Sequence, residues 1–98
     1  MKHVINNLNF IWDQHNINKN LIKHKVSFKE AEEIFIDEKR KILNDKLHSN
    51  NEVRFIIIGK TKKKRMLFAV FTFRKSYIRI ISIRDLNKKE KYLYEKNT

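Results

Sequence analysis

The chain has 98 residues, which is enough for one compact domain over residues 1–98 and too few for two. Its hydrophobic fraction of 41% supports a globular interior, and the lack of cysteine excludes a disulfide framework and a thiolate metal site. The net charge of +12 favours a polyanionic partner, nucleic acid above all. A coding bias toward Lys and Asn would give the same excess, and charge does not separate a nuclease from a protein that only binds.

The sequence carries no sign of a targeting or membrane segment. The N-terminal stretch MKHVINNLNFIWD lacks the continuous apolar core of a signal peptide, and no apolar run approaches the length that crosses a bilayer. With the lack of cysteine, this predicts a cytoplasmic protein without a membrane partner.

The first predicted elements are a short apolar stretch at residues 8–12 and a helix. Asp13 is a candidate cap for this helix, and Ile17 and His24 lie on one of its faces at helical spacing. We expect the helix to end near Lys25.

A second helix is predicted from a capping box. Ser27 and Glu30 have the spacing at which a hydroxyl and a carboxylate each accept from an otherwise unpaired backbone N–H. Ala31, Ile34 and Phe35 follow as an apolar stripe.

Strands are predicted from residue 40 onward. Residues 40–47, RKILNDKL, fit a weak edge strand, because their charges and irregular alternation suit an exposed edge. Residues 53–59, 66–73 and 77–83 have strong strand composition and short connections, which predicts an antiparallel meander. Both alternating sets of MLFAVFTF, residues 66–73, are apolar, so we expect a central strand that is covered on both faces.

A final helix is predicted to follow Asn87, which has a second capping-box partner in Glu90. This helix would present Leu86, Leu93 and Tyr94 to the sheet. The fold class is therefore α+β, with an N-terminal helix pair and a C-terminal helix laid on an antiparallel sheet meander.

Motifs for nucleotide cofactors and zinc hydrolysis are absent from the sequence, which has no G-x-G-x-x-G, P-loop, G-x-S-x-G or H-E-x-x-H. The four histidines, at positions 3, 15, 24 and 48, lack the spacing of metal ligands on a shared element. We expect neither a cofactor nor a metal site.

The stretch SYIRIISIRD places two arginines in a strand of isoleucines. A guanidinium in a strand interior is costly unless it reaches solvent, a carboxylate or a bound anion. Arg79 and Arg84, with Arg54 on a neighbouring strand, are candidates to bind phosphate and to stabilise the charge that develops when RNA is cut by its own 2′-hydroxyl. The alternative is that each arginine pairs with a nearby carboxylate.

On a regular strand Arg79 and Arg84 point to opposite faces, because their positions differ by an odd number. Both can serve one site only if the strand twists or ends near Ile83. His24 is a candidate general acid or base, although a lone histidine on an apolar helical face is also often a packed residue.

The connection KTKKKR is a dense cationic turn. It contains five candidate nucleic-acid-binding residues: Lys60, Lys62, Lys63, Lys64 and Arg65. They could steer the RNA backbone, or they could form a solvated turn that keeps the sheet soluble.

From about residue 9 to 95, the sequence resembles the BrnT toxins of bacterial type II toxin-antitoxin systems. The matching residues are Trp12, Asp13, Asn20, Lys23, His24, Val26, Ser27, Phe28, Glu30, Ala31, Glu52, Arg54, Ile58, Gly59, Arg79, Ile80, Ile81, Ser82, Arg84, Glu90 and Tyr94. One departure is Lys25, which stands where the family usually has a glycine. A glycine there would cap the preceding helix at positive φ, so this chain must hold a lysine in that conformation or end its helix differently.

The resemblance implies a RelE-like α+β fold and a metal-independent ribonuclease that arrests translation. It also implies a BrnA-like antitoxin, a toxin dimer bridged through antitoxin dimers, and operator DNA bound only through the antitoxin. By position, Arg54, Arg79 and Arg84 would contact the phosphate, with Glu52 and His24 as weaker acid-base candidates. The rival interpretation is a basic RNA- or DNA-binding module without catalysis.

Overall fold

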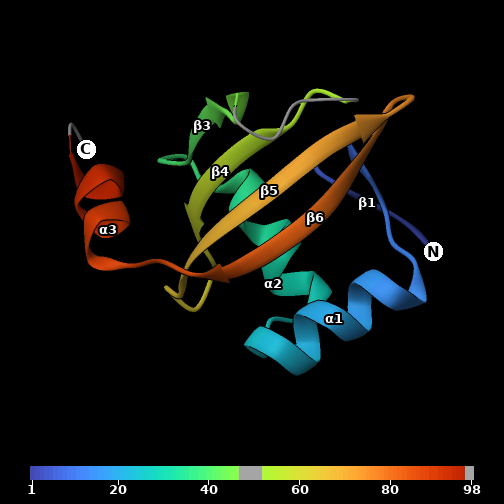
Figure 1. Ribbon diagram of the computed structural model, residues 1–98, viewed down its shortest axis with the longest axis horizontal. Helices are drawn as coiled ribbons and strands as arrows, with labels where there is room; N and C mark the ends of the chain where they lie inside the picture. Colours follow the sequence, from blue (N-terminus) through green and yellow to red (C-terminus); the bar gives the residue numbers. More distant parts are fainter. Residues whose placement is uncertain (47–51, 97–98) are drawn as a thin grey trace.

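The computed structural model describes residues 1–46 and 52–96, without the side chains of residues 18–22. Within them the strands form one six-stranded sheet in the order β1-β2-β6-β5-β4-β3 (Figure 1). The strands are β1 (Lys2–Ile5), β2 (Leu8–Ile11), β3 (Lys41–Asn44), β4 (Phe55–Lys60), β5 (Met66–Arg74) and β6 (Tyr77–Asp85).

The predicted meander is confirmed. Strands β3 to β6 pair antiparallel in chain order, and β3 lies at the edge of the sheet, as its charged and irregular sequence indicated. The expectation of a wholly antiparallel sheet is wrong, because β2 pairs parallel with β6 through Phe10 and Ile78.

The N-terminal hairpin of β1 and β2 was not predicted from the sequence. It turns at Asn6 and Asn7, which have φ of 48° and 65°. Positive φ at both central residues is the requirement of a type I′ hairpin turn, and asparagine tolerates it better than most residues. The pair of asparagines between two apolar stretches was the available signal.

The helices form where the sequence predicted them. They are α1 (Gln14–His24), α2 (Phe28–Glu33), which continues as the short 3-10 helix η1 (Ile34–Ile36), and α3 (Lys88–Glu95). Both capping boxes are present, at Ser27 with Glu30 and at Asn87 with Glu90. Lys25 has a φ of 54°, so the chain places a lysine in the left-handed conformation that follows α1. None of the helices in the described residues is long and apolar enough to span a bilayer.

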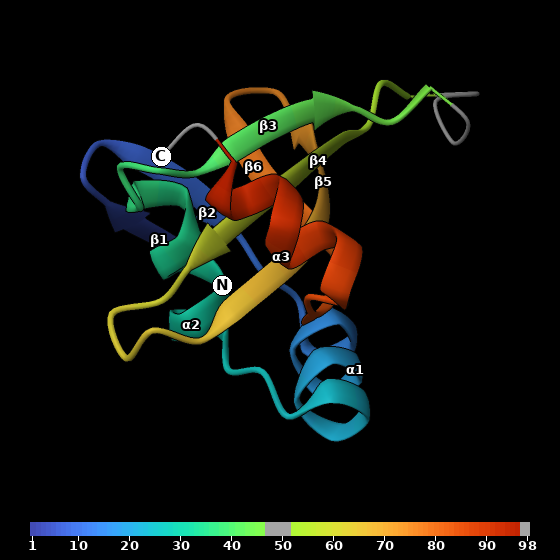
Figure 2. The same cartoon turned by 90° about the vertical axis from the view of Figure 1, so that its left-hand side faces the viewer.

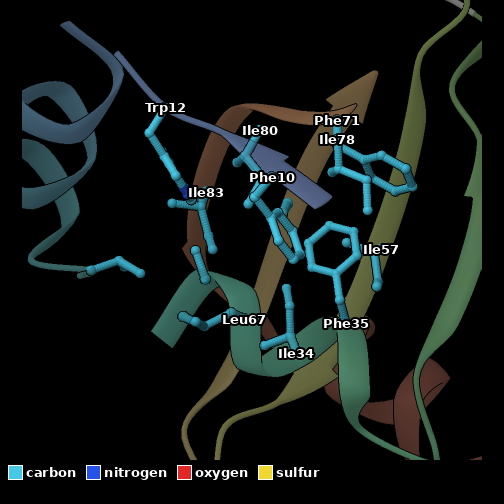
Figure 3. Close-up of a cluster of buried hydrophobic side chains, with 13 residues drawn as sticks. Phe10, Trp12, Ile34, Phe35, Ile57, Leu67, Phe71, Ile78, Ile80 and Ile83 are labelled. Atoms are coloured by element: carbon cyan, nitrogen blue, oxygen red, sulfur yellow. The ribbon is translucent and has the colours of Figure 1, made fainter. Parts of the chain in front are cut away.

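The main core lies between the sheet and the segment formed by α2 and η1 (Figure 3). Phe35 of η1 makes edge-to-face ring contacts with Phe10 and with Phe71 at centroid distances of 5.1 and 5.0 Å. Gly59 of β4 allows η1 to pack against the strand backbone, since a Cβ there would lie 2.7 Å from the carbonyl oxygen of Ile34.

Helix α3 covers part of the opposite face of the sheet (Figure 2). Leu86 and Tyr94 are buried there with Ile58, and Met66 and Phe68 of β5 pack against them. The expectation that β5 is covered on both faces therefore holds only for its first residues, and Phe73 near its end is 53% exposed. The expectation that Leu93 is buried is wrong, because its exposed fraction is 36%. The Tyr94 hydroxyl donates to Oδ2 of Asp37 at 2.5 Å and so ties the helix to the turn before β3.

Candidate functional site

A bulge in β6 decides where the strand arginines point. Val70 of β5 pairs with Ser82, but the next residue, Phe71, pairs with Ile80, so Ile81 is left without a partner in the ladder. A bulge of this kind adds one residue to one strand and changes the face to which the following side chains point.

The consequence is that Arg79 and Arg84 lie on the same face of the sheet, although they are five positions apart. Arg79 pairs with Thr72 and Arg84 with Phe68, and alternate residues of β5 share a face. The expectation that β6 would end near Ile83 is wrong, because the strand continues to Asp85. The bulge, and not the end of the strand, turns Arg79 and Arg84 to the same face.

Arg54 extends the same arrangement to a third strand. It comes directly before β4, in which Phe55 pairs with Phe71, so continuing the register by one residue places Arg54 opposite Thr72. We call this side of the sheet, with Arg54, Val70, Ser82, Arg79 and Arg84, the arginine face. In Figure 1 it faces the viewer, and no helix crosses in front of β5 and β6.

Arg79 is held at the edge of β6 by α1. Its Nη1 donates to Oδ2 of Asp13 at 2.9 Å, and its Nη2 donates to Oδ1 of Asn16 at 3.3 Å. The buried Asn16 in turn donates from Nδ2 to the carbonyl oxygen of Ile80 at 2.8 Å. Helix α1 therefore covers the edge of β6 beyond the short β2 and fixes the guanidinium there.

Arg84 is held by α3. Its two terminal nitrogens donate to the two carboxylate oxygens of Glu90, each at 2.8 Å. The guanidinium carbon lies 4.1 Å from the ring centroid of Phe68, a distance typical of a cation–π contact. The hydrogen bond from Arg84 lowers the pKa of the Glu90 carboxyl below its usual value.

Each of the three predicted arginines therefore has a carboxylate within salt-bridge distance. Arg54 lies 3.8 Å from Glu52, measured from Nη2 to Oε1. The sequence offered carboxylate pairing as the alternative to phosphate binding, and the structure contains these pairs. They do not exclude an anion, since a guanidinium has five N–H donors and Arg79 uses two of them on Asp13 and Asn16.

Glu52 and His24, the acid-base candidates, lie at opposite ends of the sheet. Glu52 precedes β4 next to Arg54, whereas the carbonyl oxygen of His24 accepts from Arg65, directly before β5. Thr72 of β5 lies seven residues after Arg65, which is about 23 Å along an extended strand. The structure therefore does not bring Glu52 and His24 together around one phosphate.

Arg65 has a role that the sequence did not indicate. All five of its N–H donors are used within the protein: on Asp85 twice, at 2.8 and 3.1 Å, on Glu30 at 3.2 Å, and on the carbonyl oxygens of His24 and Lys25 at 3.0 and 2.9 Å. It joins the end of α1 to α2 and β6. This geometry favours a structural role over the predicted contact with nucleic acid.

The four lysines of the same connection are arranged differently from one another. Lys60 lies on the sheet, with its ammonium 5.6 Å from the ring centroid of Tyr94. Lys62, Lys63 and Lys64 are exposed in the turn, and the backbone N–H of Lys62 donates to Glu33. Their role in steering RNA stays a prediction.

No group of three or more His, Cys, Asp or Glu side chains with the arrangement of a metal site occurs in residues 1–46 and 52–96. The sequence did not indicate that Asp13, Asn16 and Glu90 are partners of the arginines. Asp13 and Glu90 carried a signal only for helix capping, and their second contacts depend on chain packing.

The chain is a small basic α+β domain whose described residues place three arginines on one open face of a six-stranded sheet. Residues 12–90 match the sequence model of the family described as ribonuclease toxin, BrnT, of type II toxin-antitoxin system, and the chain belongs to this family. The resemblance stated from the sequence is therefore confirmed.

A solved structure has the same fold. The crystal structure of the Brucella abortus ribonuclease toxin BrnT superposes with a TM-score of 0.60 over 81% of this chain and 96% of that chain, at 21% sequence identity. A search of curated proteins finds no match.

The family makes this chain a ribonuclease toxin of a type II toxin-antitoxin system, with RNA as substrate and an antitoxin as partner. The interpretation as a ribonuclease is thereby preferred over the non-catalytic binding module. The RelE-like description of the fold stays a prediction.

Proposed function

We propose that the protein cleaves RNA on the arginine face without a metal ion, by attack of the substrate's own 2′-hydroxyl on the adjacent phosphate. In this reaction the bond from O2′ to phosphorus forms and the bond from phosphorus to O5′ breaks. The 2′-hydroxyl loses its proton and the 5′-oxygen gains one. The products are a 2′,3′-cyclic phosphate and a 5′-hydroxyl.

The observation that carries this proposal is the bulge at Ile81, which places Arg79 and Arg84 on the same face of the sheet as Arg54. The pentacoordinate phosphate of this reaction gains negative charge on its oxygens, and permanently charged, bidentate guanidinium groups are suited to stabilise it.

The role of each arginine follows from its contacts. Arg79 keeps three N–H donors beyond its bonds to Asp13 and Asn16, and it would contact the phosphate without leaving α1. Arg84 is bound in bidentate fashion by Glu90, so a phosphate would compete with that carboxylate or share the guanidinium with it.

The test is cleavage of an end-labelled RNA by the purified protein in excess EDTA. We expect cleavage to continue, to leave 2′,3′-cyclic phosphate ends, and to stop when a 2′-deoxynucleotide replaces the nucleotide at the cleavage site. Dependence on an added metal ion, or equal cleavage of the 2′-deoxy substrate, would contradict the mechanism. The 2′-deoxy substrate should still bind, because its phosphates are intact.

We further propose that a BrnA-like antitoxin covers the arginine face and supplies acidic or apolar groups complementary to it. The toxin would be a dimer within the hetero-oligomer, and operator DNA would be bound through the antitoxin alone. RNA cleavage in the bacterial cytoplasm would then arrest translation when the antitoxin is lost. Addition of the cognate antitoxin should abolish cleavage, and a stable complex with full activity would rule out this arrangement.

A further inference from the structure

Ser82 lies in the centre of the arginine face. It pairs with Val70 of β5, between the row of Thr72 with Arg79 and the row of Phe68 with Arg84. The β5 partner of Ser82 is two residues from the β5 partner of Arg79 and two residues from that of Arg84. The Cα atom of Ser82 is therefore about 7 Å from the Cα atom of each arginine along the strand direction. Both long arginine side chains can therefore reach a group bound over Ser82.

The hydroxyl of Ser82 has no hydrogen-bond partner among residues 1–46 and 52–96. The side chain is half-buried, and its Oγ makes no hydrogen bond with any residue of the described part of the chain. Ser82 Oγ is also not one of the fully buried atoms that lack a partner in the described residues, so it reaches the surface of the arginine face, where a ligand can meet it. The Oγ–H is thus a donor on the arginine face that nothing in the fold uses.

Packing does not explain a serine at this position. The nearest residues across the sheet on this face are apolar, since Val70 pairs with Ser82 on one side and with Ile56 on the other. A β-branched apolar residue would fill such a place better than serine, which has little strand preference. Within β6, the neighbouring Ile81 and Ile83 follow that rule.

We infer that Ser82 is a further catalytic residue, whose Oγ–H donates a hydrogen bond to a non-bridging oxygen of the scissile phosphate. The inference rests on the proposed ribonuclease mechanism. Arg79 and Arg84 contact the phosphate from the two ends of this stretch of β6, and the hydroxyl of Ser82 contacts it from the strand between them. Ser82 keeps its proton throughout, and no bond to its oxygen forms or breaks.

The bulge supports this role. Ile81 directly precedes Ser82, and bulges commonly occur next to active sites, where they change the direction of a side chain. Without the extra residue, Ser82 and Arg84 would share a face but Arg79 would point to the core. The bulge is therefore what places the hydroxyl between two guanidinium groups.

The first experiment compares single-turnover cleavage by the wild type, Ser82→Ala, Ser82→Thr and Ser76→Ala, on an RNA whose cleavage site has been mapped with the wild type. Ser76 is an exposed serine in the turn between β5 and β6, so it is a matched control. We expect Ser82→Ala to lower the cleavage rate about 10- to 100-fold with little change in KM, because the lost donor acts on developing charge. Ser82→Thr should recover most of the rate, and Ser76→Ala should match the wild type.

The second experiment replaces either non-bridging oxygen of the scissile phosphate with sulfur, in the two separate diastereomers. For one diastereomer, the sulfur should lower the cleavage rate of the wild type. The same sulfur should not lower the rate of Ser82→Ala further, because this variant already lacks the hydrogen bond to that oxygen. A structural role for Ser82 would not produce this non-additivity. Full additivity for both diastereomers, or a wild-type rate for Ser82→Ala, would overturn the inference.

Arg79→Ala, assayed in parallel, separates this inference from the proposed function. If Arg79→Ala is slow while Ser82→Ala has the wild-type rate, the arginine mechanism stands and the role of Ser82 fails. If Arg79→Ala also cleaves at the wild-type rate, the proposed site itself is wrong.

Discussion

Replacement of Arg79 by Ala should lower the cleavage rate far more than the stability of the fold. The substitution removes an ion pair with Asp13, whose side chain is 51% exposed, and such a pair contributes about 0.5 kcal/mol. It also removes a 3.3 Å contact to Oδ1 of the buried Asn16, which costs on the order of 1 kcal/mol. The free energy of unfolding should therefore fall by about 1.5 kcal/mol, which lowers Tm by about 6–12 °C.

The rate should respond on a different scale. Removing a donor that contacts developing charge lowers the rate of an enzyme by about 100- to 1,000-fold, or about 3–4 kcal/mol in the transition state. The loss of activity by Arg79→Ala should thus exceed its loss of stability by about 2 kcal/mol. Thermal unfolding followed by circular dichroism and single-turnover cleavage at 25 °C measure the two quantities on the same preparation.

Asp13→Asn is the matched control. It removes the carboxylate of the ion pair but keeps an oxygen that can accept from the backbone N–H of Asn16, and Asn and Asp are about equally good helix N-caps. We expect a Tm decrease of about 2–4 °C and a cleavage rate within about threefold of the wild type. If Asp13→Asn loses as much activity as Arg79→Ala, the guanidinium acts through the fold and its assignment to the phosphate is refuted.

Three further predictions concern the fold. Lys25→Gly should raise the unfolding free energy by about 1 kcal/mol in thermal melts, because the φ of 54° strains a lysine and not a glycine; an unchanged Tm would contradict this. Gly59→Ala should lower the free energy of unfolding, measured by urea denaturation, by about 1–3 kcal/mol, because the new Cβ would lie 2.8 Å from Cβ of Ile34. A wild-type urea midpoint would show that η1 can move away. The pKa of Glu90 is lowered by Arg84, so this carboxylate stabilises the fold above about pH 4 and the stabilisation is lost as the pH falls below that value. The Tm advantage of the wild type over Glu90→Gln should therefore shrink between about pH 5 and pH 3, and a constant difference would refute the linkage.

The sequence by itself determined most of the helices and the meander. Their signals are local: the side chain of Ser27 accepts from the N–H of Glu30 three residues away, and Asn87 and Glu90 repeat the arrangement. For Lys25 the sequence and the family resemblance left two outcomes open, a lysine at positive φ or a helix that ends differently, and the structure has the first, with a φ of 54°. Strand composition and short connections were sufficient for the order of β3 to β6.

The N-terminal hairpin and its parallel pairing to β6 were decided by tertiary structure. Strands of four residues such as β1 and β2 carry too little alternation to be recognised, and Phe10 meets Ile78 across most of the chain length. Nothing near Phe10 in the sequence specifies which strand it joins, because the choice depends on the edge that the finished meander leaves open.

The site shows the same division. The sequence identified Arg79 and Arg84 as arginines that packing does not explain, because a guanidinium among isoleucines has a local cost. Their common face could not be predicted, since the bulge at Ile81 has no signature in a run of strand-forming residues and arises from pairing with β5. In the sequence, Asp13 and Glu90 were recognisable only as helix-capping residues. Their contacts with the arginines depend on tertiary packing, which places the start of α1 next to Arg79 and α3 next to Arg84.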